Sequence, residues 1–331
     1  MTRFCMIGCG EHALSSHGPA QARYVAEHPG TDLAGCCDLD AARAAGYRAQ
    51  FGFARAYTDL AAMIEAERPD AAALVVPDGL TASLGTRLLE HGLPLLIEKP
   101  PGRTLDEVDQ LIAAAQRQGR TVPHQVAFNR RFVPLVREAR RRLAAIGPPT
   151  GIQHVHYEMT RVDRRDPDFS TTAIHGLDAV RFLAAADYAE ARFRYHDLPE
   201  KGHGVSNVFV DAVMTTGATA HLAFCPTAGV VVERATVHAG SHTLFLHIPM
   251  WGAFDSPGRL QHVESGHTVT DLPPLGRAAP GPFVLGGFYG EYEAFLGDLA
   301  AGRPPSPSLS ESRQSVEVAA CVRRREREFH A

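Results

Sequence analysis

The sequence predicts two α/β domains, an N-terminal doubly wound parallel sheet followed by an α+β domain with a largely antiparallel, open sheet. Length is the first indication, because 331 residues exceed the usual size of one domain. The second is the strict alternation of short β-rich runs with amphipathic helical stretches over residues 3–128. The third is the change after "GPPTG" (147–151), where alternating β runs and turns dominate. We assign residues 1–124 to the first domain and 125–331 to the second, with the C-terminal helices packing back.

The first domain opens with an apolar run that turns to glycine, and similar runs follow at intervals. The expected strands are "RFCMIG", "DLAGCCD", "AALVVP", "LPLLIE" and "TVPHQVAF". Between them lie the expected helices Ala20–His28, Ala41–Phe51 and Ser83–His91. Thr104 and Glu107 form a capping box that starts a further helix. This alternation predicts parallel strands joined by helical crossovers.

The second domain is expected to be mainly β, after a helical stretch from Phe132 to Ile146. Its expected strands are "IQHVHYEM", "SNVFVDAV", "TAHLAF", "VVVERATVHA", "HTLFLHI" and "RLQHVES". Further helices are expected in "IHGLDAVRFLAA", "YGEYEAFLGDLAAG" and "SESRQSVEVAACV".

Composition argues against several kinds of partner. A formal net charge of −4 provides no concentrated basic surface, so we expect neither nucleic acid nor a membrane as partner. The N-terminal "MTRFCMIGCG" resembles neither a signal peptide nor a membrane span, which predicts a cytoplasmic protein. The six cysteines show no Cys-x-x-Cys spacing. His154 and His156 lack a third ligand at a recognisable spacing, so we expect no metal ion.

A glycine-rich turn follows the first strand. "GCGEHA" (Gly8–Ala13) has the Gly-x-Gly-x-x-Ala form, in which bare backbone brings amide donors and a helix N-terminus against a pyrophosphate. Asp38 ends the second strand, where a carboxylate accepts hydrogen bonds from a ribose diol and repels a 2′-phosphate. The expected cofactor is therefore NAD, with NADP less suited. The residues of this region expected to bind it are Gly8, Gly10, Glu11, His12 and Asp38.

The stretch "LPLLIEKPPG" (Leu93–Gly102) is an apolar strand that ends in an acid and a base. Ligands of open parallel sheets bind outside the carboxyl ends of the strands, where Glu98 and Lys99 lie. Pro100 and Pro101 restrict the backbone just beyond them. Lys99 is therefore a candidate to place its ammonium group near the reacting carbon of a nicotinamide.

In order along essentially the whole chain, these motifs resemble the landmarks of one family, the glucose-fructose oxidoreductase, inositol dehydrogenase and rhizopine catabolism family (Gfo/Idh/MocA). The landmarks are "GCGEHA", "VVPDG" (75–79), "EKPPG" (98–102), "FNRRFVP" (128–134), "IHGLDAVRFL" (174–183) and "EYEAFLGDLAAGRPPSPSL". The resemblance implies an N-terminal nicotinamide-binding Rossmann domain and a substrate held between the domains. It also implies a C-terminal open sheet used for contacts in a homodimer or homotetramer.

The resemblance also assigns roles to residues. Pro77 and Glu98 match cofactor-binding positions, and Lys99 matches a lysine that contacts both cofactor and substrate. His175 matches the acid/base residue of the family, with Asp178 three residues further on. For a hydroxyl substrate, this implies that His175 removes the proton and Lys99 stabilises the developing alkoxide during hydride transfer.

One departure from the family lies four residues before His175, where Thr171 stands in place of the aspartate of many sugar and inositol dehydrogenases. A threonine can hydrogen-bond a substrate hydroxyl but cannot stabilise an imidazolium by charge. Asp168 could substitute for that aspartate from nearby.

Three arginines, Arg161, Arg164 and Arg165, precede the expected catalytic helix. One of them could bind a carboxylate or phosphate of an acidic sugar. The alternative is a solvated loop in which they pair with the neighbouring Asp163, Asp166 and Asp168. The expected substrate-binding residues are Arg161, Thr171 and Asp178.

We therefore expect an NAD-dependent oxidoreductase that acts on a secondary alcohol, or the matching ketone, of a sugar, cyclitol or sugar derivative. One alternative is an NAD-dependent glycoside hydrolase that passes through a transient 3-keto sugar. Another is a non-catalytic, cofactor-binding regulator that responds to sugars. Lys99 and His175 favour an enzyme, because such a regulator does not need them.

Overall fold

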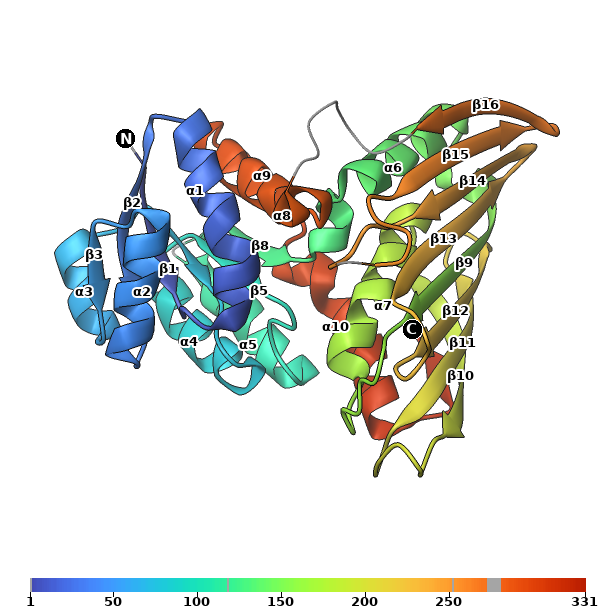
Figure 1. Ribbon diagram of the computed structural model, residues 1–331, viewed down its shortest axis with the longest axis horizontal. Helices are drawn as coiled ribbons and strands as arrows, with labels where there is room; N and C mark the ends of the chain where they lie inside the picture. The colour runs from blue at the N-terminus through green and yellow to red at the C-terminus, as the bar shows by residue number, and fades with distance from the viewer. Residues whose placement is uncertain (1, 118, 252, 273–280) are drawn as a thin grey trace. The chain divides into compact units, whose positions relative to one another are not determined.

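The computed structural model describes residues 2–117, 119–251, 253–272 and 281–331 (Figure 1). The chain divides into two compact units. Unit 1 comprises Met1–Asn129 and Gly287–Val316, and unit 2 comprises Arg130–Gly286 and Glu317–Ala331. Unit 1 therefore runs past the expected boundary at 124/125, because the strand His124–Ala127 pairs with its sheet. It also includes a C-terminal segment that the sequence assigned to the second domain.

Unit 1 is built on a parallel sheet, which confirms the predicted doubly wound architecture. Among the described residues it has six strands in the order β3-β2-β1-β4-β5-β8. The chain starts at the centre of the sheet, runs outward to β3, and then returns beside β1 to build the other half. The reversal between β1 and β4 marks the place where doubly wound sheets bind ligands. The strands are β1 (Thr2–Ile7), β2 (Thr31–Cys37), β3 (Arg55–Tyr57), β4 (Ala71–Leu74), β5 (Leu95–Glu98) and β8 (His124–Ala127).

Helices connect these strands, and the returning helix α9 packs beside α1 (Figure 1). The predicted capping box is confirmed, because Thr104 and Glu107 each accept a hydrogen bond from the other's backbone amide at 3.2 Å. No helix in the described part of the chain combines the length and hydrophobicity that crossing a bilayer requires. The elements are the π-helical turn η1 (Ala13–His17), α1 (Gly18–Glu27), α2 (Ala41–Phe51), α3 (Leu60–Glu67), α4 (Asp78–Glu90), α5 (Leu105–Ala115), the hairpin β6 (Gln116–Arg117) and β7 (Arg120–Thr121), α9 (Phe288–Ala300) and the start of α10 (Leu309–Arg324).

The sequence does not predict β3 and α3. β3 has only three residues, two of them exposed, so it shows no apolar run. α3 does have a start signal, because Asp59 accepts a hydrogen bond from the Ala62 amide as an N-cap. The sequence therefore contains a start signal for α3 that we did not use, whereas it contains no pattern that predicts β3.

Unit 2 is built on a mostly antiparallel sheet, as predicted. Its described residues form nine strands in the order β16-β15-β14-β13-β9-β12-β11-β10-β17, and of the pairs found there only β9 with β12 is parallel. The sequence does not predict β10, β16 or β17, whose exposed positions carry charged and polar side chains apart from Val269 of β16. The strands are β9 (Ile152–Thr160), β10 (Tyr188–Asp197), β11 (Ser206–Met214), β12 (Thr219–Cys225), β13 (Val232–Ala239), β14 (His242–His247), β15 (Arg259–Glu264), β16 (His267–Leu272) and β17 (Glu328–His330).

Two long helices lie on one face of this sheet (Figure 1). α7 (Ser170–Ala184) contacts β9 and β12, and α6 (Pro134–Ile146) contacts β14 and β15. On the opposite face, His156 of β9 is exposed, whereas its chain neighbours Val155 and Tyr157 are buried. The remaining helical segments are η2 (Asn129–Phe132), η3 (Pro149–Gly151) and α8 (Pro282–Leu285).

Candidate cofactor and active site

The glycine-rich turn leaves β1 where the strand order of unit 1 reverses. Gly8 has a φ of +92°, and a Cβ built on it would lie 1.9 Å from the carbonyl oxygen of Val75, which follows β4. Only glycine permits this close approach of two strand ends. A Cβ on Gly10 would meet no atom within 4 Å. The fold therefore requires Gly8, whereas Gly10 leaves bare backbone open to a pyrophosphate.

Asp38 follows β2 directly and is held by two backbone amides. One carboxylate oxygen accepts a hydrogen bond from the Cys9 amide at 2.8 Å, and the other accepts one from the Asp40 amide at 2.9 Å. Each oxygen keeps a lone pair that can accept a ribose hydroxyl. The next residue, Leu39, is 89% exposed and supplies no positive charge for a 2′-phosphate. The residues at this strand end therefore fit NAD.

Glu98 ends β5 and lies between two imidazoles. Its Oε1 is 3.6 Å from His12 Nε2, and its Oε2 is 3.4 Å from His17 Nε2. Burial raises the pKa of the Glu98 carboxyl, but the contacts with His12 and His17 and the charge of Lys99 lower it more, so the net pKa falls below its usual value. Burial lowers the pKa of His17. Glu98 is therefore an anion at neutral pH and faces a neutral His17.

The sequence reasoning did not single out His17, although a histidine five residues after His12 on the same helical segment could have suggested it. Pro77 follows β4 and caps α4, with its carbonyl accepting a hydrogen bond from the Leu80 amide at 2.8 Å. Lys99 follows β5. Unit 1 thus brings the expected cofactor residues together at the carboxyl ends of β1, β2, β4 and β5; they are Gly8, Gly10, Glu11, His12, Asp38, Pro77, Glu98 and Lys99.

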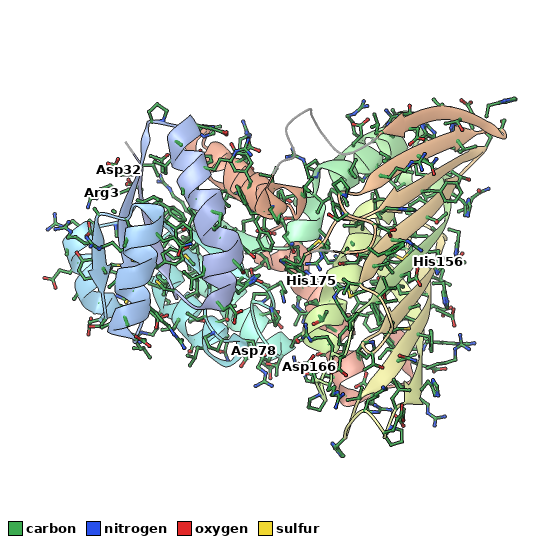
Figure 2. The ribbon with its side chains drawn as sticks, in the orientation of Figure 1. Arg3, Asp32, Asp78, His156, Asp166 and His175 are labelled. Carbon is green, nitrogen blue, oxygen red and sulfur yellow. The ribbon has the colours of Figure 1, made fainter. Side chains whose placement is uncertain are left out.

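In unit 2, His175 lies on α7 and is only 5% exposed (Figure 2). The helix approaches the sheet closely at the next residue. A Cβ on Gly176 would lie 2.7 Å from the ring of Phe224 and 2.8 Å from the ring of Tyr157. The absence of a side chain there sets the distance between α7 and strands β9 and β12, and so fixes the position of His175 within unit 2.

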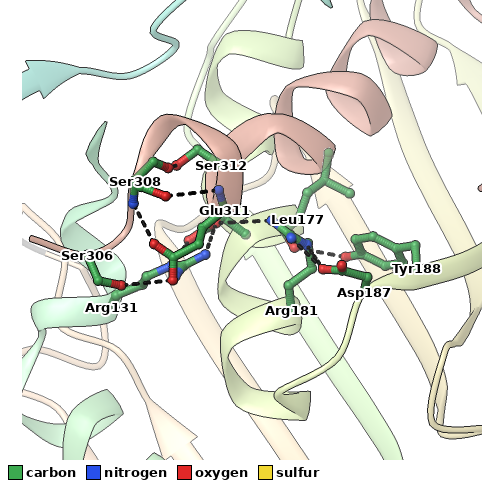
Figure 3. A network of polar contacts seen from close by, with 10 residues as sticks. Arg131, Leu177, Arg181, Asp187, Tyr188, Ser306, Ser308, Glu311 and Ser312 are labelled. Carbon is green, nitrogen blue, oxygen red and sulfur yellow. Dashed lines mark hydrogen bonds and ion pairs between the residues drawn. The ribbon is translucent and has the colours of Figure 1, made fainter. Parts of the chain in front are cut away.

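Asp178 lies one turn after His175 and is fully buried. Each of its carboxylate oxygens accepts a hydrogen bond of 2.7 Å from Arg131, a bidentate ion pair. Nearby on α7, the Leu177 carbonyl accepts a hydrogen bond of 2.9 Å from the Tyr188 hydroxyl (Figure 3). The sequence predicted Asp178 as a substrate ligand, and within unit 2 its carboxylate has Arg131 as an internal partner.

Arg161 is also buried and belongs to a cluster around Glu233. Its Nη2 donates to Glu233 at 2.9 Å, Arg130 donates to both carboxylate oxygens at 3.1 and 3.0 Å, and the Tyr157 hydroxyl donates at 2.8 Å. Burial raises the pKa of Glu233, but the charges of Arg130 and Arg161 lower it more, to about 2. Two guanidinium groups therefore share one carboxylate, and Arg161 has a structural partner.

The sequence reasoning missed Arg130 and Glu233 as a pair. Arg130 stood in the quoted "FNRRFVP", but Glu233 is 103 residues away, and no local pattern connects the two. The exposed arginines follow the solvated-loop alternative. Arg164 pairs with Asp166, and Arg165 pairs with Asp163, each at 2.7 Å, with all four side chains near half exposure.

Asp168, which could substitute for the aspartate that Thr171 replaces, has a partner at each carboxylate oxygen. One of its oxygens accepts a hydrogen bond from the Ser170 amide at 2.9 Å, at the start of α7. The other accepts one from Arg323, also at 2.9 Å. Asp168 therefore holds the N-terminus of α7, and Thr171 lies half-buried in the first turn of that helix.

Comparisons with known proteins show which family the N-terminal part of the chain resembles and which solved structures share its fold. A family model described as "Oxidoreductase family, NAD-binding Rossmann fold" matches residues 2–126. An inositol 2-dehydrogenase from Saccharopolyspora erythraea is 31% identical over 122 residues, which are 36% of each chain. An inositol 2-dehydrogenase from Ralstonia nicotianae is 29% identical over 213 residues, covering 62% of this chain and 60% of the relative. The chain thus spans less than two thirds of the length of these curated relatives.

Among solved structures, the UDP-N-acetylglucosamine 3-dehydrogenase from Acidithiobacillus ferrooxidans has a TM-score of 0.79 at 22% identity, covering 97% of this chain and 96% of that one. This similarity shows a shared fold. The parallel sheet, the glycine turn and Asp38 define a dinucleotide-binding protein of the Rossmann class. Over residues 2–126, the chain thus resembles the NAD-binding Rossmann domain of an oxidoreductase family.

Proposed function

We propose that the protein is an NAD-dependent oxidoreductase that transfers a hydride between nicotinamide and a secondary alcohol, or the matching ketone, of a sugar, cyclitol or sugar derivative. The observation that carries this proposal is the open backbone at Gly10 beside the fixed carboxylate of Asp38. Glu98 and Lys99 lie at the end of a strand of the same sheet. Relatives named inositol 2-dehydrogenase and UDP-N-acetylglucosamine 3-dehydrogenase support a polyhydroxylated substrate.

The residues of unit 1 fit NAD in preference to NADP. The bare turn and the helix that follows it offer backbone amides to a pyrophosphate, and Asp38 offers acceptors to a ribose diol. A 2′-phosphate would meet the Asp38 carboxylate and the uncharged Leu39. When bound, the dinucleotide would supply the hydride acceptor or donor.

In this proposal, His175 takes the proton of the substrate hydroxyl in the oxidative direction and returns it in the reductive direction. The Lys99 ammonium stabilises the negative charge that develops on the same oxygen. Thr171 hydrogen-bonds a further hydroxyl of the substrate. Asp178 and Arg161 act as positioning residues through their ion pairs, because buried partners occupy their charged groups.

The test is NADH formation, measured at the nicotinamide absorbance band, with NAD and a panel of cyclitols, aldoses, uronates and aminosugars. We expect His175→Ala to lower kcat/KM for a responding compound by about 10² to 10⁴-fold. The matched control is His156→Ala, an exposed histidine on the sheet of the same unit. Equal turnover in wild type and His175→Ala would remove the proposed role. Release of an aglycone without NADH accumulation would favour the hydrolase alternative.

We also propose a cytoplasmic homodimer or homotetramer with no nucleic-acid or membrane partner. Free thiols at all six cysteines suit a reducing compartment, and the net charge of −4 does not favour polyanions. Sedimentation at micromolar concentration should show an oligomer, and a monomer under those conditions would contradict the proposal.

A further inference from the structure

Three potential metal ligands meet in unit 1, at the start of the first helical segment. His12 precedes η1, His17 is the last residue of η1, and Glu98 ends β5. One ligand atom from each residue lies within 4.8 Å of the other two, and no other group of this kind occurs among the residues that the structure describes. The prediction of no metal ion rested on His154 and His156 and did not consider these three residues.

The separations agree with those of a tetrahedral metal site. Two ligand atoms that each lie 2.0–2.1 Å from a tetrahedral zinc ion are about 3.4 Å apart. The Glu98 oxygens lie 3.4 Å from His17 Nε2 and 3.6 Å from His12 Nε2. His17 Nε2 and Glu98 Oε2 are buried and make no hydrogen bond. Two buried ligand atoms thus lie 3.4 Å apart without a hydrogen bond that would occupy them.

The orientation of His17 is set by a chain of buried hydrogen bonds. Its Nδ1 lies 2.9 Å from the Tyr292 hydroxyl, which accepts a hydrogen bond from Gln21 Nε2 at 2.8 Å. Gln21 Oε1 accepts a further one from Tyr47 at 2.8 Å. A tyrosine hydroxyl can donate to Nδ1 or accept from it, so the bond persists when Nε2 loses its proton to a metal. Partners of this kind orient metal-binding histidines.

The surroundings favour one open coordination position. The ring of Phe288 packs edge-on against both imidazoles, with centroids 5.5 Å from His12 and 5.4 Å from His17. The His12 side chain is 39% exposed, whereas that of His17 is fully buried. An ion could therefore enter past His12 and keep a water molecule on that side.

We propose that His12, His17 and Glu98 bind one divalent transition-metal ion. Two imidazole nitrogens and one carboxylate match the ligand preference of zinc and not that of magnesium or calcium. This inference does not depend on the proposed oxidoreductase activity. It does have a consequence for it, because His12 and Glu98 also belong to the proposed dinucleotide site, where an ion would alter cofactor binding.

The test is metal binding to the full chain after treatment with a chelator. Zinc affinity is measured by competition with a chromophoric chelator, and cobalt(II) serves as a probe because tetrahedral cobalt absorbs strongly in the visible region. We expect one tight equivalent in the wild type. His12→Gln should weaken it by at least tenfold while the fold is retained, since His12 is partly exposed. Tyr292→Phe should weaken it by about 10 to 100-fold.

His156→Gln is the matched control, because this histidine lies on the sheet face of unit 2, close to His221. It should leave the tight equivalent unchanged. A wild type without a tight equivalent would overturn the proposal. So would a tight equivalent that survives His12→Gln but is lost in His156→Gln, since that result would place the metal on the sheet histidines. Dinucleotide binding, followed by NADH fluorescence with and without zinc, is a separate readout that tests the proposed function by itself.

Discussion

In unit 1, the residues proposed to bind the dinucleotide lie where parallel strands end, and backbone groups do much of the positioning. The turn at Gly8 and the amides that hold Asp38 are examples. In unit 2, the proposed catalytic histidine lies on a helix packed against a sheet, and buried ion pairs hold the surrounding elements. The difference shows that the strand-end site of unit 1 depends mainly on backbone shape, whereas the helix-on-sheet site of unit 2 depends on buried ion pairs together with the close approach at Gly176. Four substitutions or conditions test this contrast.

The largest expected effect is in unit 2. Glu233→Ala would leave Arg130 and Arg161 buried without their shared carboxylate, which should lower the free energy of unfolding by about 3 to 5 kcal/mol. Denaturant unfolding followed by circular dichroism measures this change. The control is Asp163→Ala, which removes an exposed ion pair with Arg165 and should cost less than about 1 kcal/mol. Similar costs for the two variants would contradict a special role of buried charges in unit 2.

Acid should weaken the same cluster. The pKa of Glu233 falls from 4.5 to about 2 on folding, so its contribution is complete above pH 4.5 and is lost as the pH falls toward 2. This contribution is about 3 kcal/mol. The unfolding free energies of the wild type and Glu233→Gln should therefore converge over that interval. If the difference in the free energy of unfolding between the two proteins stayed constant from pH 5 to pH 2, the Glu233 carboxylate would not titrate as described.

Gly176→Ala is the next largest change. The added Cβ would clash with the rings of Phe224 and Tyr157 and move α7 away from the sheet. This change should lower the free energy of unfolding by about 2 kcal/mol. The same substitution at Gly46, within α2 of unit 1, meets no atom within 4 Å and should stabilise by about 0.5 to 1 kcal/mol. Thermal unfolding of both variants gives the comparison. If both substitutions changed the stability in the same direction, the close contact between α7 and the sheet would not explain the effect of Gly176→Ala.

The smallest expected effect is in unit 1. Thr104→Ala removes the hydroxyl that caps α5 and should cost about 1 kcal/mol. Thr104→Ser keeps a hydroxyl at the cap and should restore most of the loss. If Thr104→Ser were as unstable as Thr104→Ala, the methyl group and not the hydrogen bond would explain the effect. Unfolding in urea can resolve differences of this size.

Local patterns predicted what local interactions determine. The alternation of strands and helices, the turn at Gly8 and the cap at Thr104 were all visible in the sequence because each depends on residues a few positions apart. The strands β3 and β17, of three residues each, were not visible, since an edge strand needs only a neighbour to pair with. We expected the C-terminal helices to pack back, but strand alternation could not show that Gly287–Val316 belongs to unit 1.

The residues of the candidate site also divide into those that local patterns predict and those that they do not. Motif positions identified Asp38, Glu98 and Lys99, because strand ends can be read from the sequence. The partners of Asp178 and Arg161 could not be read, since Arg131 and Glu233 lie 47 and 72 residues away. A charged residue near a catalytic motif can serve the substrate or the fold. Only its spatial neighbours decide between the two.

The order of segments along the chain has a consequence for biosynthesis. Unit 1 contains Met1–Asn129 but is completed by Gly287–Val316, which the ribosome makes after most of unit 2. Two contacts of unit 1 require that segment. The Val126 amide donates to the Pro307 carbonyl at 2.8 Å, and the Tyr292 hydroxyl hydrogen-bonds His17. During synthesis, unit 1 therefore lacks these contacts until nearly the whole polypeptide has emerged, although all six strands of its sheet are made early. A gene fragment that ends at residue 129 would lack these contacts, and fusions or split versions of the protein should retain the C-terminal segment.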